Sequence, residues 1–389
     1  MRRYIQLRNY IDAAAFKEMI LCANAALHAN VQAINDLNVF PVPDGDTGTN
    51  MALTMDKAAT ELKKKEFDTI AAAADCVASA LLRGARGNSG VILSLLFRGI
   101  SKRLKGLDTA GAQEFAGAMQ DGVDAAYKAV MKPAEGTILT VSRMAAAAAV
   151  EAANAGASLE SCLDCAIKAG NDALAETVNQ NPVLKKAGVI DAGGQGYMYI
   201  LGAMLASYRG EITAPENVDE IVETEKESSA FDVFDTEDIT FAFDTVFIVR
   251  KHDPDVDLEP LRKYLTSIGD SLVIGEDDEA FKVHVHTNIP GDALSEAQKY
   301  GTLELAKIEN MRLQHDDLTA GRKARSTDDL EAVEKELESQ PAPQPDGPAA
   351  PEKRYGSVAV CAGEGLAGVF RDLGVDEIIE GGQTKVGGP

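Results

Sequence analysis

Two aspartates around a single glycine carry the clearest chemical signal in this chain. Asp44 and Asp46 flank Gly45 in the segment NVFPVPDGDTGTNM, so in an extended or turned loop both carboxylates can point the same way. Oxygen ligands of this kind hold Mg²⁺ at roughly 2.0–2.1 Å and leave room for substrate phosphates. The spacing therefore predicts a divalent-cation clamp.

A helix is expected to begin directly after this clamp, in TGTNMALTMDKAATELKKK, with Gly48, Thr49 and Asn50 at its N-terminus. Free backbone N–H groups and hydroxyls at a helix N-terminus bind phosphate. The structural alternative is an ordinary turn in which Thr49 or Asn50 caps the helix. A metal clamp beside a phosphate cradle is what a nucleotide polyphosphate requires.

Three further glycine-rich loops also precede apolar helical patterns. They are ARGNSG at residues 85–90, PAEGT at 133–137 and DAGGQG at 191–196. Together the four loops could place four helix N-termini around one ligand. None has the GxxxxGK[ST] pattern of a P-loop or a GxGxxG motif after a strand, so neither of those nucleotide folds is favoured.

Helices must position these loops. Stretches such as FKEMILCANAALHANVQAI and LDCAIKAGNDALAETV carry apolar residues at helical spacing, while alternating β-branched residues are scarce. Alanine-rich segments such as MAAAAAVEAANAG let neighbouring helices approach closely. An all-helical barrel or bundle is predicted for the first part of the chain.

The four loops together resemble the ATP-binding DhaL domain of the dihydroxyacetone kinase family, over roughly residues 1–208. In detail, LNVFPVPDGDTGTNM, ARGNSGVIL, KPAEGTILTV and DAGGQG resemble the ATP-binding subunits of bacterial fatty acid kinases. The resemblance implies a barrel of eight helices that holds Mg-ATP at one end with its interhelical loops.

The resemblance also implies roles for individual residues. Asp44 and Asp46 would bind magnesium, with Asn38 as a third ligand where ketose kinases have an aspartate. The residues expected to meet phosphate oxygens are Thr47, Thr49, Asn50, Asn88, Ser89 and Gly90. Those expected to lie towards the ribose and base are Thr137, Asp191, Gly193 and Gly194. Arg86 would neutralise charge on the transferred phosphoryl group, and a solvated or structural arginine is the alternative.

Composition favours a cytoplasmic enzyme with more than one domain. A chain of 389 residues exceeds the usual size of a single core. The net charge of −23 argues against nucleic acid as a partner and makes a metal necessary for binding polyanionic ATP. No apolar run approaches a membrane span, and no signal peptide is expected. Five cysteines, an odd number, fit a reducing compartment.

The texture of the sequence changes after Gly210. The acidic stretch ENVDEIVETEKESS predicts a solvated linker over 209–235. DITFAFDTVFIV, DSLVIG and AFKVHVHTN alternate as strands, and the helical patterns LEPLRKYLTSIG and DALSEAQKYGT separate them. These features predict a small α/β domain over 236–320. It resembles the middle domain that follows DhaL in the fatty acid kinase family, and we expect a homodimer through it.

His284 and His286 lie two apart on one expected strand, so both imidazoles face the same side. Two histidines on one side are half of a zinc site. By resemblance a cysteine on the preceding strand completes the site, and this chain has Asp244 there. Aspartate is a legitimate but harder ligand, so the expectation is Zn²⁺ or a different metal. The alternative is a histidine pair at an interface between subunits or domains.

The last part of the chain reads as a linker and a fragment. Clustered Pro, Glu and Gln without an apolar period predict a flexible linker over 321–354. Residues 355–389 read as strand, helix and strand, one βαβ unit that resembles the opening of a DegV-like domain. One such unit cannot bury its sheet, so we expect a truncated fragment.

The function predicted from these features is ATP-dependent phosphotransfer. By resemblance, the acceptor is a fatty acid carboxylate presented by a separate lipid-carrying protein, and the product is an acyl phosphate. Phosphoryl transfer mainly needs positioning and charge neutralisation, which the metal clamp and helix termini provide. Two alternatives stay open. One is a kinase of a small ketone or polyol, and the other is a non-catalytic nucleotide-binding regulatory or scaffold protein.

Overall fold

The computed structural model describes residues 9–41, 43, 45–215, 239–314, 356–361 and 363–380. Asp44, residues 216–235 of the expected acidic linker and all of the expected linker at 321–354 lie outside the described residues. The chain divides into two compact units, Met1–Asp329 and Leu330–Pro389.

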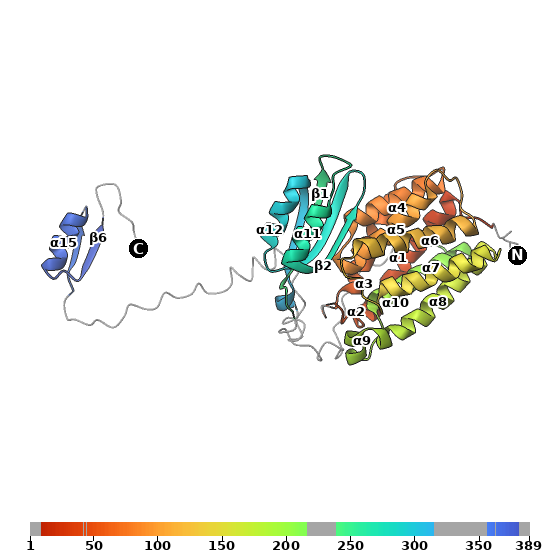
Figure 1. Ribbon diagram of the computed structural model, residues 1–389, viewed down its shortest axis with the longest axis horizontal. Coiled ribbons are helices and arrows are strands. Elements are labelled where there is room, and N and C mark those ends of the chain that lie inside the picture. The colour runs from red at the N-terminus through yellow and green to blue at the C-terminus, as the bar shows by residue number, and fades with distance from the viewer. Residues whose placement is uncertain are drawn as a thin grey trace. The chain divides into compact units, whose positions relative to one another are not determined.

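Eight helices of 15 to 22 residues dominate the described part of the first unit (Figure 1). They are α1 (Ala13–Ala29), α3 (Thr47–Lys63), α4 (Ile70–Gly84), α5 (Gly87–Leu104), α6 (Ala112–Ala129), α7 (Ile138–Asn154), α8 (Leu159–Gln180) and α10 (Ala192–Tyr208). The short helices α2 (Val31–Asn35) and α9 (Pro182–Ala187) lie between them along the chain. Side chains cap several of these helices, as Asp12 and Thr69 do by accepting from Ala15 N and Ala72 N.

The long helices close into a barrel. Helices α4 to α8 each pack against the next in order, and α10 packs against both α8 and α1, while α1 packs against α4. One continuous apolar core fills the interior. Small residues set the closest approach, because a Cβ at Gly122 of α6 would lie 2.4 Å from the Leu96 carbonyl oxygen of α5. The predicted all-helical barrel is confirmed.

A four-stranded antiparallel sheet follows in the same unit. Its strands are β1 (Phe243–Lys251), β2 (Gly269–Glu276), β3 (Ala280–Thr287) and β4 (Gly301–Asn310), in the order β2-β3-β1-β4. Helices α11 (Glu259–Ile268) and α12 (Pro290–Ala297) and the 3₁₀ turn η3 (Gln298–Tyr300) complete it. The α/β character is as predicted, but β4 is a strand that was not expected from the sequence.

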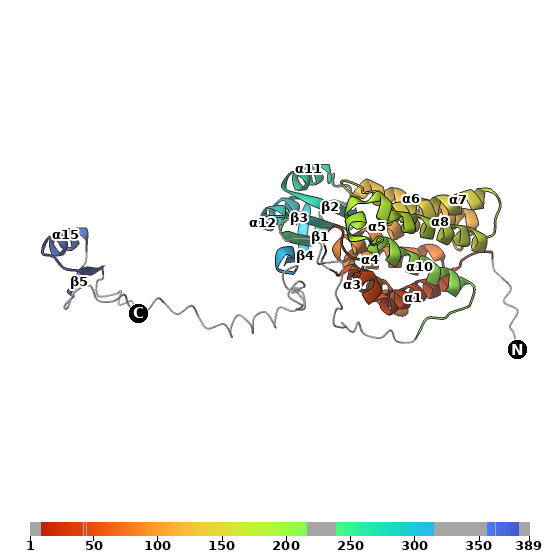
Figure 2. The same cartoon turned by 90° about the horizontal axis from the view of Figure 1, so that it is seen from below.

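The two faces of the sheet pack against different partners. Phe247, Val283 and Val285 share an apolar cluster with Leu261 and Leu265 of α11. The opposite face meets the barrel, since α5 packs against β2 and β3 and α6 packs against β2. In Figures 1 and 2 the sheet accordingly lies between α12 and the helices of the barrel. The alternation of β3 therefore sends its remaining side chains towards the barrel.

In the second unit, β5 (Val358–Cys361) and β6 (Glu377–Glu380) pair in parallel, with α15 (Glu364–Asp372) between them in the chain. This is the predicted order of strand, helix and strand. None of the helices in the described ranges is long and apolar enough to cross a membrane.

Candidate nucleotide and metal site

The starts of α3 and α5 lie against each other. Gly87 has a φ of 56°, and a Cβ there would lie 2.6 Å from the Asn50 side-chain nitrogen. One turn further, a Cβ at Gly90 would lie 2.4 Å from the Thr54 hydroxyl oxygen, which also accepts from Arg86 N at 3.1 Å. Glycine is needed at both positions because the two helix starts approach closely. The first two glycine-rich loops therefore form one continuous surface.

The starts of α7 and α10 meet in the same way. A Cβ at Gly194 would lie 2.9 Å from the Val141 side chain of α7. A Cβ at Gly196 would lie 2.6 Å from Met51 Sδ, in the second turn of α3. The structure thus brings all four predicted glycine-rich loops to one end of the barrel.

Two asparagines hold the first turn of α3. Asn35 Oδ1 accepts from Gly48 N at 2.7 Å and Thr49 N at 3.2 Å, while its Nδ2 donates to Thr49 Oγ1 at 3.0 Å. Asn38 Oδ1 accepts from Thr47 N at 3.1 Å and also from the Thr47 hydroxyl. Asn35 was not predicted from the sequence, where its only signal is its position just before the metal clamp.

These contacts decide what the two threonines can offer. Thr49 receives a hydrogen bond from Asn35, which leaves its hydroxyl proton for a phosphate oxygen. Thr47 donates its proton to Asn38, which leaves oxygen lone pairs. Asp46 is half-buried immediately before α3. Asp44, the other predicted clamp residue, lies outside the described residues.

The start of α5 presents polar side chains to the same end. Asn88 and Ser89 are half-buried in its first turn, and in the described ranges neither side chain has a hydrogen bond to another protein group. Arg86 is the residue before α5, and its charge is felt by Lys282 of β3. Burial, together with Arg86 and Lys307, lowers the pKa of Lys282 to about 7. The predicted phosphate loop is therefore also next to the sheet.

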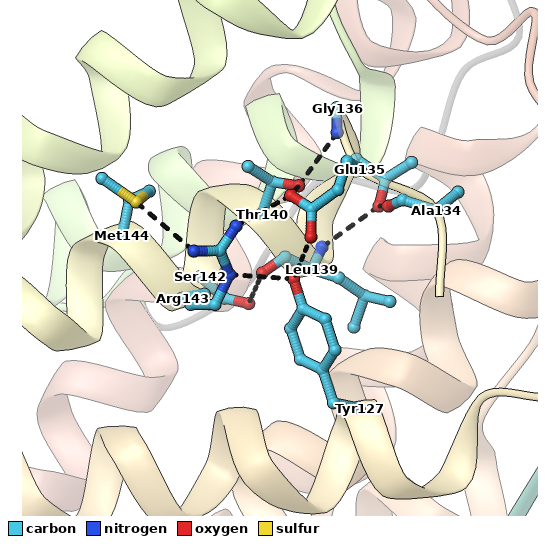
Figure 3. A network of polar contacts seen from close by, with 10 residues as sticks. Tyr127, Ala134, Glu135, Gly136, Leu139, Thr140, Ser142, Arg143 and Met144 are labelled. Atoms are coloured by element: carbon cyan, nitrogen blue, oxygen red, sulfur yellow. Dashed lines mark hydrogen bonds and ion pairs between the residues drawn. The ribbon is translucent and has the colours of Figure 1, made fainter. Parts of the chain in front are cut away.

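The loop before α7 is fixed by a polar network, shown in Figure 3. The carboxylate of Glu135 accepts from Thr140 Oγ1 at 2.7 Å and Arg143 Nη2 at 2.8 Å, and Tyr127 also donates to it. Although partial burial opposes ionisation, the hydrogen bonds from Thr140 and Arg143 hold the pKa of Glu135 below its ordinary value. Thr137 caps α7 and donates to the Ala134 carbonyl oxygen at 2.8 Å, so its hydroxyl is engaged within the loop.

The start of α10 contains a buried carboxylate. Asp191 accepts from Gly194 N at 2.7 Å, and its own N–H donates to Thr177 Oγ1 at 3.1 Å. Burial raises the pKa of Asp191 to about 6, against the opposing hydrogen bonds from Gly194 and Ile138. Gly193 and Gly194 are buried beside it. This carboxylate acts as a helix cap, and its burial at the end of the barrel where the four loops meet disfavours its ionised form.

The second predicted cluster lies on the barrel-facing side of the sheet. Asp244, His284 and His286 can each present a ligand atom within 4.8 Å of the others. The two Nε2 atoms of the histidines are 3.1 Å apart, and Asp244 Oδ1 lies 3.3 Å from His284 Nδ1. Asp244 Oδ1 and His284 Nδ1 are buried without a hydrogen-bond partner. Such buried polar atoms are costly unless something binds them.

The donor set fits a zinc-type ion. Two nitrogens bound at roughly 2.0–2.1 Å to one tetrahedral Zn²⁺ lie roughly 3.3–3.4 Å apart, close to the observed separation. Burial lowers the pKa of His284 well below its ordinary value, which keeps the ring neutral as a ligand must be. A hydrogen bond between the two imidazoles is the alternative use of the same geometry.

Charges from both domains meet at this cluster. Burial raises the pKa of Asp244 to about 7, opposed by His286, while the carboxylates of Glu309 and Asp46 raise it further. Asp270 Oδ1 lies 3.5 Å from His286 Nδ1. Asp270 was not predicted from the sequence, because only the pairing of β2 with β3 places it opposite His286. The charge of Asp46, one of the two residues of the predicted cation clamp, therefore acts on the histidine cluster.

Comparison with known proteins agrees with this arrangement of helical barrel and sheet. The DAK2 domain matches residues 41–206, and the FakA-like middle domain of fatty acid kinase matches residues 240–318. The chain belongs to the family of proteins that join these two domains.

Several bacterial relatives align along nearly the whole chain. Protein YloV of Bacillus subtilis is 42% identical over 381 residues, which cover 96% of this chain and 66% of that protein. An uncharacterized protein of Staphylococcus saprophyticus is 38% identical over 384 residues, with the same coverage of 96% and 66%. The chain thus spans about two thirds of the length of these relatives.

A weaker likeness exists to a solved structure. The native form of the dihydroxyacetone kinase of C. freundii aligns with a TM-score of 0.39 and 18% identity. The alignment covers 53% of this chain and 36% of the kinase. Similarity at this level is too low to support an argument about function.

Proposed function

We propose that this chain is the ATP-binding component of a Mg-ATP-dependent phosphotransferase that acts on a fatty acid carboxylate. The observation that carries the proposal is the convergence of four glycine-rich helix starts at one end of the barrel, beside Asp46. Helix N-termini and hydroxyls favour phosphate oxygens, and a carboxylate favours the divalent cation that accompanies them. The match to the DAK2 domain supports a nucleotide as the ligand.

The proposed roles follow from what each group can donate or accept. Asp44 and Asp46 would hold Mg²⁺, and Asn38 would be a third ligand if its Oδ1 exchanged the Thr47 hydroxyl for the ion. The ion would supply charge neutralisation for the phosphates. Asn35 Nδ2 donates to Thr49 Oγ1, so the hydroxyl proton of Thr49 would be free to donate to a phosphate oxygen. The other groups proposed to contact phosphates are Asn50, Asn88, Ser89 and Gly90, joined by Thr47 once its hydroxyl is released from Asn38.

Three further groups complete the proposed nucleotide site. Arg86 would stabilise charge on the phosphoryl group during transfer. The loop held by Glu135, together with Thr137 and the start of α10 at Asp191, would face the ribose and base.

The acceptor is proposed to be an acyl carboxylate. One carboxylate oxygen would bond to the γ-phosphorus while the bond from that phosphorus to the β–γ bridging oxygen breaks, giving an acyl phosphate and ADP. No general base is needed because the acceptor arrives as an anion. The match of residues 240–318 to the FakA-like middle domain of fatty acid kinase supports this acceptor class. A separate cytoplasmic protein that carries the lipid would deliver it.

The middle domain has two further proposed properties. Asp244, His284 and His286 would hold Zn²⁺, a role supported by their grouping within 4.8 Å and by the 3.1 Å separation of the two histidine Nε2 atoms. A homodimer would form through the same domain. Its edge strand β4 carries the exposed apolar side chains Leu305 and Ile308, and an exposed edge of this kind is suited to pairing.

A transfer assay tests the function. The purified chain is mixed with γ-labelled ATP, Mg²⁺ and a fatty-acid-loaded carrier protein, and acyl phosphate is trapped with hydroxylamine as a hydroxamate. Acyl hydroxamate that forms only when both carrier and Mg²⁺ are present supports the proposal. Label transferred to free dihydroxyacetone without carrier would favour the ketone kinase. Tight Mg-ATP binding without transfer to either acceptor would favour the non-catalytic alternative.

A further inference from the structure

We propose that the middle domain positions two of the nucleotide loops, through Lys282 and Arg262, which bind the carbonyl ends of the helices that lead into those loops. The inference deepens the proposed function and rests on it for its catalytic consequence. The positioning of the loops by Lys282 and Arg262 does not depend on that function, because it concerns how rigidly the loops are held before any nucleotide binds.

Lys282 reaches from β3 to the end of α4. Its ammonium group donates to the Arg83 carbonyl oxygen at 3.3 Å and to the Ala85 carbonyl oxygen over a shorter distance. The side chain is 3% exposed, so these carbonyls replace water as its partners. The last carbonyls of a helix lack intrahelical donors and favour a cation. Ala85 is the C-cap of α4 and the first residue of the ARGNSG loop.

Arg262 makes the equivalent contact with α6. Its Nη1 donates to the carbonyl oxygen of Ala129, the last residue of that helix, at 2.9 Å. The chain just beyond is held as well, since Met131 N donates to the Leu272 carbonyl oxygen at 3.2 Å and Val130 bridges Val273. The PAEGT loop begins two residues after Met131. The middle domain thus anchors the entry to a second nucleotide loop.

Other contacts between the sheet and the barrel have a different character. Arg83 pairs with Glu279 at 2.7 Å, and Arg98 lies 3.7 Å from Asp278, but both acidic side chains are largely exposed. Exposed pairs of this kind contribute little, and they join side chain to side chain. They hold no backbone of a nucleotide loop. Lys282 and Arg262, by contrast, each bind a backbone carbonyl in or within five residues of a nucleotide loop.

Lys282 and Arg262 contact different loops, so each can be removed separately and should loosen only its own loop. Hydrogen exchange of the nucleotide-free chain is followed in Lys282→Met and Arg262→Met, which keep most of the apolar stem and remove the donors. We expect exchange at residues 86–90 to rise about tenfold in K282M, and exchange at 133–137 to rise similarly in R262M, with little change at the other loop. Equal protection of both loops in wild type and both variants would overturn the inference.

Two control variants separate loop positioning from general loosening. Glu279→Gln removes an ion pair between sheet and barrel without touching a loop carbonyl. Lys251→Met removes another buried lysine of the sheet, one that pairs with Glu276 inside the middle domain. Neither should change exchange at 86–90 or 133–137. If either loosened these loops as much as K282M does, the anchors would have no special role and the inference would fail.

The catalytic consequence is measured on the same variants. Misplaced phosphate loops should raise the KM for ATP about tenfold, equivalent to about 1.4 kcal/mol, while the controls remain near wild type. Lys282→Arg, which still offers donors to the two carbonyls, should recover most of the loss. R262M provides the second arm if K282M does not fold.

Loosened loops in the variants of a chain whose wild type fails to bind Mg-ATP would reject the proposed function and keep the positioning role. Loosened loops with unchanged ATP kinetics would reject the catalytic consequence of the inference.

Discussion

The buried carboxylate of Asp191 should destabilise the folded chain at neutral pH, and Asp191→Asn should relieve this. Burial raises its pKa from 3.8 to about 6. One pKa unit corresponds to about 1.4 kcal/mol, so the ionised group lowers the free energy of unfolding by about 3 kcal/mol relative to a neutral one. An asparagine keeps an oxygen to accept from Gly194 and is itself a favoured helix cap.

The sign of the pH dependence follows from the direction of the shift. Between about pH 4 and pH 6 the folded state binds more protons at this site than the unfolded state, so stability from Asp191 falls as pH rises. The asparagine variant lacks this effect. Its stability relative to wild type should therefore increase by about 2.4 kcal/mol between pH 4 and pH 7 and then level off. The side-chain NH2 group that this substitution introduces could also change the free energy of unfolding, but by an amount that does not depend on pH.

Urea unfolding followed by far-ultraviolet circular dichroism, without nucleotide, measures this difference at each pH. Asp172→Asn on α8 is a matched control, since Asp172 is largely exposed and pairs weakly with Lys168. A difference between D191N and wild type that stays constant from pH 4 to pH 8 would refute the reasoning. A gain in stability together with weaker ATP binding would identify Asp191 as a group retained for function at the expense of stability.

Three further predictions concern the metals and the barrel. Asp46→Asn and Asp44→Asn should each abolish phosphotransfer with unchanged helical circular dichroism, and near-normal turnover in either would remove the clamp assignment. Protein purified without chelator should contain about one zinc per chain by elemental analysis, and His284→Ala should lose it. A metal-free wild type would reject the zinc site and leave the histidine pair as part of an interface between subunits or domains. Gly122→Ala should lower stability by about 1–3 kcal/mol because its Cβ would meet the Leu96 carbonyl oxygen at 2.4 Å. Gly202→Ala, with open space around it on α10, should instead raise stability by up to about 1 kcal/mol, and thermal unfolding of the pair checks the opposite signs.

The helical barrel can be predicted well from the sequence because its signals are local. Each glycine-rich loop is followed by an apolar helical pattern, so the starts of α3, α5, α7 and α10 can be recognised from their own residues. The strand β4 is harder to recognise. It is an edge strand with exposed Glu304 and Leu305 on neighbouring positions, which blurs the alternation that identifies a strand.

Groups that act across the fold cannot be recognised in this way. Asn35 matters because α2 packs beside the start of α3, and Asp270 matters because of its register opposite His286. Lys282 depends on which face of the sheet meets the barrel, and Arg262 depends on where the end of α6 lies beside β2 and α11. Each of these facts is set by tertiary packing, whereas His284 and His286 could be paired from the two-residue period of a single strand.

Side chains alternate between the two faces of β3, so neighbouring substitutions in this strand should change different measured properties. All eight of its residues are buried, but in two environments, with Phe281 and Val283 in the core of the middle domain and Lys282 and His284 against the barrel. Changes at the odd-numbered positions should lower the stability of the sheet. Changes at the even-numbered positions should instead alter metal content or nucleotide kinetics. A scan of this single strand would thus separate folding from chemistry by the parity of the residue number.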